Sequence, residues 1–325
     1  MLGYRPSKPL VFMSAVGLGV GGLVVLKEYV GGCRYTGKEQ MEGKNVIVTG
    51  ANTGIGKEVA KDFSKRGARV IMACRNIDKC RRARKELMLE TKNKNIYCEQ
   101  LDLASLQSVR DFAERMKKNV KKVHILVNNA GLMRCPRMLT KEGFEMQLGV
   151  NHMGHFLLTM QLLDTLKAAT PSRIVNVSST AHLRGDINFD DLNSEKAYDP
   201  AAAYNQSKLA NVLFTAELSR VLKDTGVTTY AVHPGIVNTE ITRHMGFANS
   251  FVATLFVKPL LWIFSKTPRQ GAQPVIHCAL AEGIEEHSGQ YFSDCEVAEA
   301  NPIAEDRKVA RRLWATSCRW TGLNV

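Results

Sequence analysis

The sequence lacks closely spaced cysteines. None of the eight cysteines in its 325 residues forms a Cys-x-x-Cys pair or stands near a histidine at metal-binding spacing. His152 and His155 flank Gly154 but have no third ligand nearby. Disulfide frameworks and zinc sites need clustered ligands, whereas scattered single cysteines are typical of reduced, mostly buried thiols. We therefore predict no disulfide framework and no metal centre.

Acidic residues are scarce relative to basic ones. The chain has 44 Lys and Arg against 31 Asp and Glu, a formal net charge of +13. Such a charge suggests nucleic acid, an anionic membrane surface or a phosphorylated cofactor as a partner. The basic runs at 79–94 and 117–122 contain no aromatic residue on which a base could stack. We interpret them as solvated helix faces and predict no nucleic-acid partner.

A long uncharged, mostly apolar run of 17 residues extends from Leu10 to Leu26. As a helix it would be roughly 25 Å long, a little short of the ~30 Å hydrocarbon core of a bilayer. Gly17 and Gly21 have the spacing that lets membrane helices approach closely. The run exceeds the apolar core of a usual signal peptide and no cleavage motif follows, so a cleaved peptide is the weaker alternative.

We therefore predict a membrane anchor over residues 1–30, followed by one folded domain over residues 40–325. Basic residues flank the apolar run on both sides, so the flanking charge does not set its orientation. The endoplasmic reticulum and the mitochondrial inner membrane both remain open as locations. No linker rich in Pro, Gly or Ser divides the rest of the chain, and no internal repeat is present.

Strand and helix patterns alternate downstream of the anchor. Alternation at this spacing predicts right-handed crossovers and a doubly wound parallel sheet, the Rossmann type of α/β fold. Strands are predicted at 46–48, 68–73, 96–101, 123–127, 173–177 and 228–232, with helices at 78–94, 144–166 and 201–222 and a helix capped by Ser105.

Two later segments depart from this alternation. Residues 251–264 are strongly apolar with one lysine and one proline, and we interpret them as a lid over a substrate pocket that also touches lipid. A buried helix pair is the alternative. Residues 305–320 have the pattern of a basic amphipathic helix, which we expect to cover the core.

The first predicted strand runs directly into a glycine-rich turn, Thr49-Gly-Ala-Asn-Thr-Gly-Ile-Gly56. Gly50, Gly54 and Gly56 carry no Cβ, so the backbone can turn tightly and a ligand can approach it closely. The N–H groups at the start of the following helix form a site suited to a pyrophosphate. A strand before and a helix after are the context that a dinucleotide-binding turn requires.

A carboxylate is absent where the second strand ends. In a dinucleotide fold, the side chain at this point meets the adenosine ribose, and an acidic residue would bind its 2′-hydroxyl. Residues 73–76 contain no acid, but Arg75 is suited to a 2′-phosphate. The sequence therefore predicts NADP(H) rather than NAD(H).

Tyr204 and Lys208 stand four residues apart on a predicted helix and so share one face. An ammonium some 4–5 Å from a phenol would stabilise the phenolate by about 3–4 kcal/mol, which lowers its pKa by two to three units. That shift would bring the tyrosine pKa toward neutrality, where proton transfer to a substrate is efficient.

These motifs together resemble the short-chain dehydrogenase/reductase family over about residues 40–320. Asn128-Asn-Ala-Gly131, Tyr204-Asn-Gln-Ser-Lys208 and Pro234-Gly235 with Thr239 match family motifs in order and spacing. Within the family, the chain is similar to the retinol dehydrogenase 11–14 group. Features shared with that group include Ala73-Cys-Arg75, Met133-Arg-Cys135, Gly149-Val-Asn-His-Met-Gly-His-Phe156 and the apolar N-terminus.

The resemblance implies roles for individual residues. Tyr204 would be the catalytic acid, Lys208 would lower its pKa and bind the nicotinamide ribose, and Asn151 would hold a proton-relay water. Ser179 would polarise the substrate carbonyl; Ser178 is the alternative, because either could point inward. The implied cofactor-binding residues are Gly50, Asn52, Thr53, Gly54, Ile55, Gly56, Arg75, Asp102, Asn129, Gly131, Tyr204, Lys208, Pro234, Gly235, Val237 and Thr239.

The sequence thus predicts a membrane-anchored, NADPH-dependent reductase of a lipophilic aldehyde such as all-trans-retinal. Steroids, lipid ketones and peroxidation-derived aldehydes are alternative substrates, and an NADPH-binding sensor or scaffold without activity is the alternative from another class. The presence of Tyr204, Lys208, Ser179 and Asn151 favours an enzyme. Whether the enzyme is a homodimer stays open.

Overall fold

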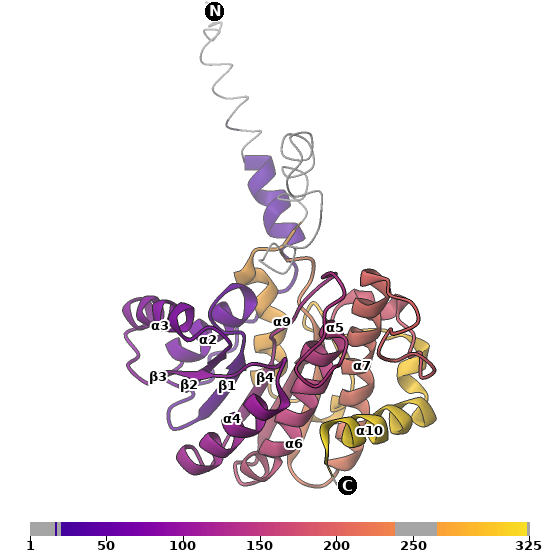
Figure 1. Ribbon diagram of the computed structural model, residues 1–325. Helices are drawn as coiled ribbons and strands as arrows, with labels where there is room; N and C mark the ends of the chain where they lie inside the picture. Colours follow the sequence, from indigo (N-terminus) through magenta and orange to yellow (C-terminus); the bar gives the residue numbers. More distant parts are fainter. Residues whose placement is uncertain (1–16, 18–20, 238–264, 324–325) are drawn as a thin grey trace, which may run out of the picture.

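One eight-stranded sheet forms the centre of the structure, a computed structural model that describes residues 17, 21–237 and 265–323 (Figure 1). Its strand order is β3-β2-β1-β4-β5-β6-β7-β8, and every neighbouring pair is parallel except β7 with β8. The strands are β1 Asn45–Thr49, β2 Arg69–Cys74, β3 Ile96–Gln100, β4 Ile125–Asn128, β5 Ser172–Val177, β6 Val227–His233, β7 Tyr291–Ser293 and β8 Glu296–Val297.

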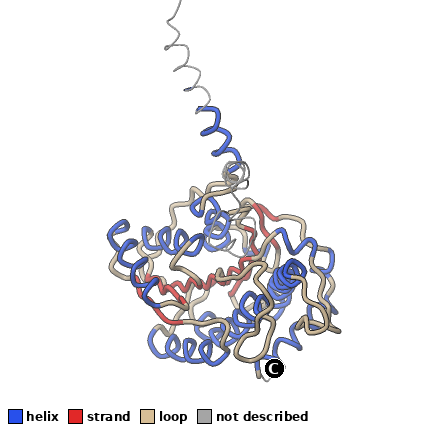
Figure 2. The backbone as a smooth tube through the Cα atoms, turned by 45° about the horizontal axis from the view of Figure 1, so that its top comes forward, coloured by secondary structure: helices blue, strands red, loops and turns tan. Residues whose placement is uncertain are grey.

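Helices cover both faces of this sheet, which appears as a layer of red strands between blue helices in Figure 2. On one face the core is built from α2, α3 and α9, and on the other from α4, α6, α7 and α10. These helices span α2 Gly54–Lys65, α3 Ile77–Thr91, α4 Leu106–Asn119, α6 Gly154–Lys167, α7 Pro200–Val221, α9 Pro268–Leu280 and α10 Arg307–Thr321.

The strands are continuously apolar because helices cover both faces of the sheet. Val46, Ile47 and Val48 are each 0 % exposed, because successive side chains of β1 enter opposite cores. The chain runs from β1 to β2 and β3 and then returns to place β4 on the other side of β1. This reversal opens a crevice at the carboxyl ends of β1 and β4, the usual ligand position in such sheets.

The predicted alternation of six strands and their helices is confirmed, and Ser105 caps α4 by accepting a hydrogen bond from Ser108 N. The helix predicted over 144–166 is broken into α5 Met146–Leu148, a π-helical turn at Gly149–Met153 and α6. β7, β8 and α9 were not predicted. The apolar residues 251–264, interpreted as a lid, lie outside the described residues.

Helix α10 matches the predicted amphipathic helix at 305–320. Leu313 is buried and Trp314 packs on Phe156 and Phe214, from α6 and α7, with ring centroids 5.2 and 5.9 Å apart. The helix therefore covers the core, as its pattern indicated.

The expectation that every cysteine is reduced was wrong for four of them. Cys33 is bonded to Cys295, and Cys80 to Cys98. The first pair joins the segment after the N-terminal helix to the turn between β7 and β8, residues that are 262 positions apart. Spacing along the sequence could not reveal a pairing made by the fold. Cys74, Cys135, Cys278 and Cys318 are buried thiols.

A helix over residues 21–30 precedes the sheet and projects away from it (Figure 1). Among the residues that the structure describes, no helix combines the length and the hydrophobicity needed to span a bilayer.

Candidate functional site

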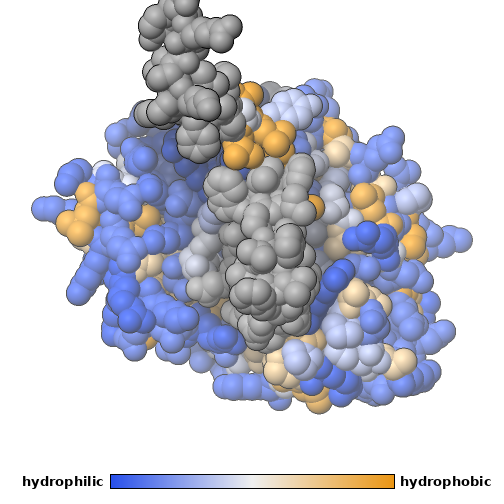
Figure 3. Space-filling model, turned by 90° about the horizontal axis from the view of Figure 1, so that it is seen from above, coloured by the Kyte–Doolittle hydropathy of each residue, from blue (hydrophilic) through white to orange (hydrophobic). Residues whose placement is uncertain are grey.

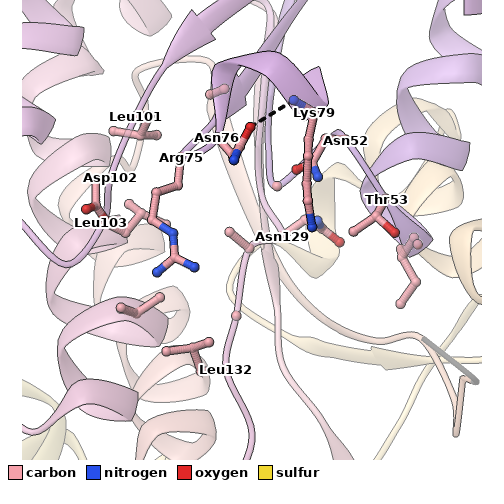
Figure 4. A pocket seen from close by; sticks show the side chains of 17 residues that line it. Asn52, Thr53, Arg75, Asn76, Lys79, Leu101, Asp102, Leu103, Asn129 and Leu132 are labelled. Carbon is pink, nitrogen blue, oxygen red and sulfur yellow. Dashed lines mark hydrogen bonds between the residues drawn. The ribbon is translucent and has the colours of Figure 1, made fainter. Parts of the chain in front are cut away.

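The crevice at the carboxyl ends of β1 and β4 holds a cavity of about 330 Å³ (Figure 4). Its walls come from the glycine-rich turn, the ends of β2 and β3, the segment after β4 and the π-helical turn. The lining residues are Gly50, Asn52, Thr53, Gly54, Ile55, Ala73, Arg75, Asn76, Lys79, Leu101, Asp102, Leu103, Asn129, Ala130, Gly131, Leu132 and Val150.

The glycine-rich turn requires glycine at Gly50, Gly54 and Gly56. Gly50 and Gly54 have φ of 67° and 58°, in the left-handed region that glycine tolerates best. A Cβ on Gly56 would lie 2.5 Å from the Asn129 amide nitrogen and 2.6 Å from the Gly50 carbonyl oxygen. Gly50 and Gly54 thus form the cavity floor, whereas Gly56 lets helix α2 pack against that floor from behind.

Helix α2 begins at this floor. The Thr53 side chain, at the N-cap, makes no capping hydrogen bond, so it leaves the first backbone N–H groups of α2 without a side-chain acceptor. Unpaired N–H groups and the helix dipole attract an anion, which suits the pyrophosphate of a dinucleotide.

Two cationic side chains reach the cavity from the end of β2 and the first turn of α3. In Figure 4, Arg75 extends into the cavity near Asp102 and Leu103, and Lys79 extends into it beside Asn52. Asn76 lies between them and accepts a hydrogen bond from Lys79 N at 2.8 Å, which caps α3. Lys79 was missed from sequence because it begins a basic run interpreted as solvated. Its spacing of four residues from Arg75 was the available signal.

Thr49, the last residue of β1, holds the segment after β4 in place. Its hydroxyl oxygen accepts hydrogen bonds from Asn129 N at 2.8 Å and Ala130 N at 2.9 Å, and it lies 2.9 Å from His155 Nε2. Asn129 also donates from its side chain to Thr49 O. The side chain of Asn129 therefore braces the cavity wall.

Asp102 lines the cavity beyond the end of β3. One carboxylate oxygen accepts a hydrogen bond from Ala104 N at 3.1 Å, and Asp102 N donates one to Ser108 Oγ at 3.0 Å. These bonds fix the turn from which Asp102 lines the cavity.

Tyr204 and Lys208 lie on α7, almost completely buried at 6 % and 3 % exposure. The ammonium nitrogen is 5.7 Å from the centre of the tyrosine ring and donates to Val177 O at 3.0 Å. A Cβ on Gly131 would lie 3.7 Å from the same nitrogen. Lys208 therefore adjoins the cavity at its Gly131 end.

Of the two candidate serines, Ser179 hydrogen-bonds the Tyr204 hydroxyl. Ser178 instead donates to Lys208 O at 2.9 Å and is buried behind the helix. Ser179 is therefore the serine that can share a substrate oxygen with the phenol.

Burial, rather than the Lys208 ammonium group, determines the pKa of Tyr204. Desolvation raises the pKa of Tyr204 to about 12, against smaller lowering contributions from Ser179 and Arg134. Desolvation also lowers the pKa of Lys208 to about 8. The expectation that Lys208 lowers the phenol pKa was wrong for the cofactor-free protein, because burial penalises both charged forms. Near neutral pH the phenol holds its proton.

Asn151 lies in the π-helical turn and its side chain is fully engaged. The amide oxygen accepts from Leu132 N at 2.8 Å, and the amide nitrogen donates to Leu132 O and to Ser207 Oγ, both at 2.9 Å. Only its main-chain carbonyl, which is 3.1 Å from His155 Nδ1, is available for a relay water. The predicted relay stays a prediction.

The segment after β6 contains three more of the predicted cofactor-binding residues, Pro234, Gly235 and Val237. Gly235 has φ of 88°, and a Cβ there would meet the Lys266 side chain at 2.6 Å. Val237, which follows Pro234 and Gly235, pairs with Lys266 through an isolated bridge. Thr239 lies outside the described residues.

The geometry fits a dinucleotide. Nine of the predicted cofactor-binding residues line the cavity itself. Lys208 adjoins the cavity at its Gly131 end, Tyr204 lies on the same helix, and the segment at 234–237 follows β6.

A profile of the short chain dehydrogenase family matches residues 44–248. Retinol dehydrogenase 13 of Mus musculus is 52% identical over 318 residues, covering 98% of this chain and 95% of that protein. Retinol dehydrogenase 12 of Homo sapiens is 51% identical over 300 residues, covering 92% of each.

Among solved structures, an uncharacterized protein from Mycobacterium paratuberculosis superposes with a TM-score of 0.70 at 34% identity. The match covers 88% of this chain and 96% of that one.

Proposed function

The chain belongs to the short-chain dehydrogenase family and is an NAD(P)-dependent oxidoreductase of the retinoid type that acts on CH–OH or C=O groups. From this premise we propose that it reduces a lipophilic aldehyde such as all-trans-retinal with NADPH. The observation that carries the proposal is the pairing of Ser179 with the protonated phenol of Tyr204, beside the buried Lys208.

NADPH, when bound, supplies the hydride for the carbonyl carbon. Gly50, Gly54 and the start of α2 would hold its pyrophosphate, since glycine leaves the backbone bare and the first N–H groups of α2 have no side-chain cap. Arg75 and Lys79 would hold the adenosine 2′-phosphate, because both cations reach the cavity and no acid stands at 73–76.

Tyr204 would donate its proton to the carbonyl oxygen while Ser179 donates a second hydrogen bond to that oxygen. A pKa of about 12 keeps the phenol protonated at neutral pH, as reduction requires. The Ser179 hydroxyl is fixed by Ala181 N, from which it accepts a hydrogen bond at 3.2 Å. Charge that develops on the substrate oxygen is then met by two prearranged donors.

The cofactor assignment is tested by reversing the charge of Arg75, the residue that follows β2. Arg75→Asp should lower kcat/KM with NADPH by at least ~100-fold and raise it with NADH, since a carboxylate binds a 2′-hydroxyl and repels a 2′-phosphate. Lys79→Met should lower the NADPH value by ~10-fold and leave the NADH value unchanged, since one cation is lost. Arg81→Met, on the same helix but outside the cavity, is the matched control. An unchanged NADPH/NADH ratio in Arg75→Asp would refute the 2′-phosphate contact.

The substrate class needs a separate experiment. Purified enzyme with NADPH is offered all-trans-retinal, a steroid ketone and a medium-chain aldehyde, and the three kcat/KM values are compared. We expect retinal to give the highest value. A higher value for either of the other compounds would replace retinal in the proposal.

We further propose that residues 1–30 anchor the domain at 40–325 to a membrane, either the endoplasmic reticulum or the mitochondrial inner membrane. Support comes from the helix over 21–30, where Val24 and Val25 are 57% and 70% exposed. Seen from above, the molecule shows a small cluster of hydrophobic residues on this face (Figure 3). Such exposure is unfavourable in water and favourable in lipid. Retention of the full chain in carbonate-washed membranes, with release of a chain beginning at residue 31, tests the anchor.

A further inference from the structure

A histidine holds the backbone of Ser179, and an asparagine holds that histidine. Ser179 caps a short 3₁₀ helix, Thr180–Arg184. Its carbonyl oxygen accepts two hydrogen bonds from His182, one from the backbone N at 3.0 Å and one from the ring nitrogen Nδ1 at 2.6 Å. The orientation of the peptide that follows Ser179 is thus fixed by His182.

The contacts of His182 define its tautomer. The carbonyl of Ser179 can only accept, so Nδ1 carries the hydrogen. At the other ring position, Nε2 accepts from Asn301 N at 3.3 Å. The ring is fully buried and lies 4.4 Å from the Tyr291 ring of β7. The imidazole is therefore neutral and locked between a backbone acceptor and a backbone donor.

Asn301 completes the arrangement from the C-terminal part of the chain. Its side-chain amide donates to His182 O and Gly185 O, both at 3.0 Å, and to Leu183 O at 3.3 Å. Its amide oxygen accepts from Ile303 N at 2.9 Å. Asn301 is 5% exposed, so each of these bonds is shielded from water.

We propose that His182 and Asn301 are positioning residues that aim the Ser179 hydroxyl at the oxygen of the substrate. The inference rests on the proposed function, because it assigns to this pair the geometry of a serine that polarises a carbonyl. Neither side chain lines the cofactor cavity. Their effect on the reaction therefore passes through Ser179. Asn301 acts from a segment more than 100 residues downstream.

Two substitutions of His182 separate its two hydrogen bonds. In His182→Asn, the amide nitrogen stands near the Nδ1 position and still donates to Ser179 O. In His182→Gln, the amide reaches the Nε2 position, keeping the Asn301 bond but losing the Ser179 bond. Each variant loses one hydrogen bond, so we expect similar falls in Tm.

Their activities should differ. We expect His182→Asn to keep kcat within about threefold of the wild type, and His182→Gln to lose ~30- to 100-fold in kcat with KM for the aldehyde little changed. NADPH binding, followed by quenching of protein fluorescence, should be the same for both. Equal kcat values for the two variants would overturn the positioning role and leave His182 a structural residue.

A double-mutant cycle with Ser179→Ala shows whether the effect passes through the serine hydroxyl. If it does, His182→Gln lowers kcat no further in the Ser179→Ala background. An additional drop of the same size as in the wild type would contradict the proposal. Full activity of Ser179→Ala would instead refute the serine role in the proposed function, so the two failures are distinguishable.

Asn301→Asp extends the test to the second residue. The carboxylate keeps the acceptor for Ile303 N but loses the donors to three carbonyls of the 182–185 turn. We expect a ~10-fold or greater fall in kcat, since the turn that carries His182 is released. This fall too should vanish in the Ser179→Ala background; persistence there would exclude Asn301 from the positioning of the serine.

Discussion

At the scale of single residues, the buried phenol of Tyr204 is the group on which the proposed reduction depends most. Tyr204→Phe should lower kcat by ~10³-fold or more, since removal of a general acid costs about 10²- to 10⁴-fold. NADPH affinity should change less than about twofold, because the aromatic ring remains. Loss of turnover in a kinetic assay, with an unchanged fluorescence titration of NADPH, would show that the hydroxyl serves catalysis and not cofactor binding.

Tyr198 offers a matched control for that substitution. Its hydroxyl donates to Cys135 O at 2.7 Å and receives a bond from Gln147, so it serves the fold near the same site. Tyr198→Phe should cost about 1 kcal/mol of stability and leave kcat nearly unchanged. Comparable activity in the two phenylalanine variants would remove Tyr204 from the acid role.

The lowered pKa of Lys208 predicts that the activity of the free enzyme depends on pH. Burial lowers the pKa of Lys208 to about 8, from an ordinary value of 10.5. The ammonium form is present below pH 8 and is lost as the pH rises through that value. Since kcat/KM for NADPH reports the free enzyme, it should fall about tenfold per pH unit above pH 8.

The variant Lys208→Arg keeps its charge throughout this range, so whatever activity it retains should lack the alkaline fall. A wild-type profile that stays flat to pH 10 would show that Lys208 is not desolvated in solution.

How far the sequence predicts individual residues depends on whether a motif or the fold brings them together. Gly50, Gly54 and Arg75 lie where they were expected, because strand, turn and helix are local features. Burial is not local, and the pKa of Tyr204 therefore departs upward instead of downward. His182 and Asn301 carried no signal, since their hydrogen bonds join segments 119 positions apart.

At the scale of elements, the helices and strands with strong periodicity were predictable, and short or irregular ones were not. The three-residue β7 and two-residue β8 are too brief to show alternation. The π-helical turn keeps the apolar pattern of the helix around it, so its presence at Asn151 is invisible in the sequence.

The disulfide between Cys33 and Cys295 is an element-scale feature with a measurable consequence. It closes a loop of 262 residues, whereas the bond between Cys80 and Cys98 closes one of 18. In the chain-entropy treatment, the longer loop constrains the unfolded chain more, by about 2 kcal/mol. Cys33→Ser should therefore lower the free energy of unfolding more than Cys80→Ser.

The measurement is urea unfolding of each variant with and without a reducing thiol. Dithiothreitol should destabilise the wild type and Cys80→Ser, and should hardly affect a Cys33→Ser/Cys80→Ser double variant. Insensitivity of the wild type to dithiothreitol would mean that these cysteines are reduced in the folded protein, as the sequence alone suggested.

At the scale of the whole molecule, buried histidines set the response of stability to acid. Desolvation lowers the pKa of His152 to about 4, of His155 to about 3 and of His233 to about 4. Each ring packs into the protein: His155 beside Thr49, His152 beside Ser317 and His233 at the end of β6. All three stay neutral in the folded state under conditions that protonate them in the unfolded chain.

The unfolded chain therefore binds more protons than the folded protein between about pH 6.5 and 4, and stability falls as the pH falls through that window. Three such histidines would together cost about 5 kcal/mol between pH 6.5 and 5. Glu145 offsets part of this loss, because burial raises its pKa and the folded state then takes up a proton. The net effect is still a large fraction of a typical folding free energy.

Urea unfolding at pH 7, 6 and 5 measures this slope, and His152→Gln isolates one contributor. Glutamine keeps a polar atom near Nε2 for Ser317 Oγ but cannot take up a proton in the unfolded chain. The variant should therefore lose about 1 kcal/mol less per pH unit than the wild type below pH 6, whatever its stability at pH 7. Parallel slopes for the two proteins would show that His152 titrates alike when folded and unfolded, which its complete burial against Phe156 and Phe214 argues against.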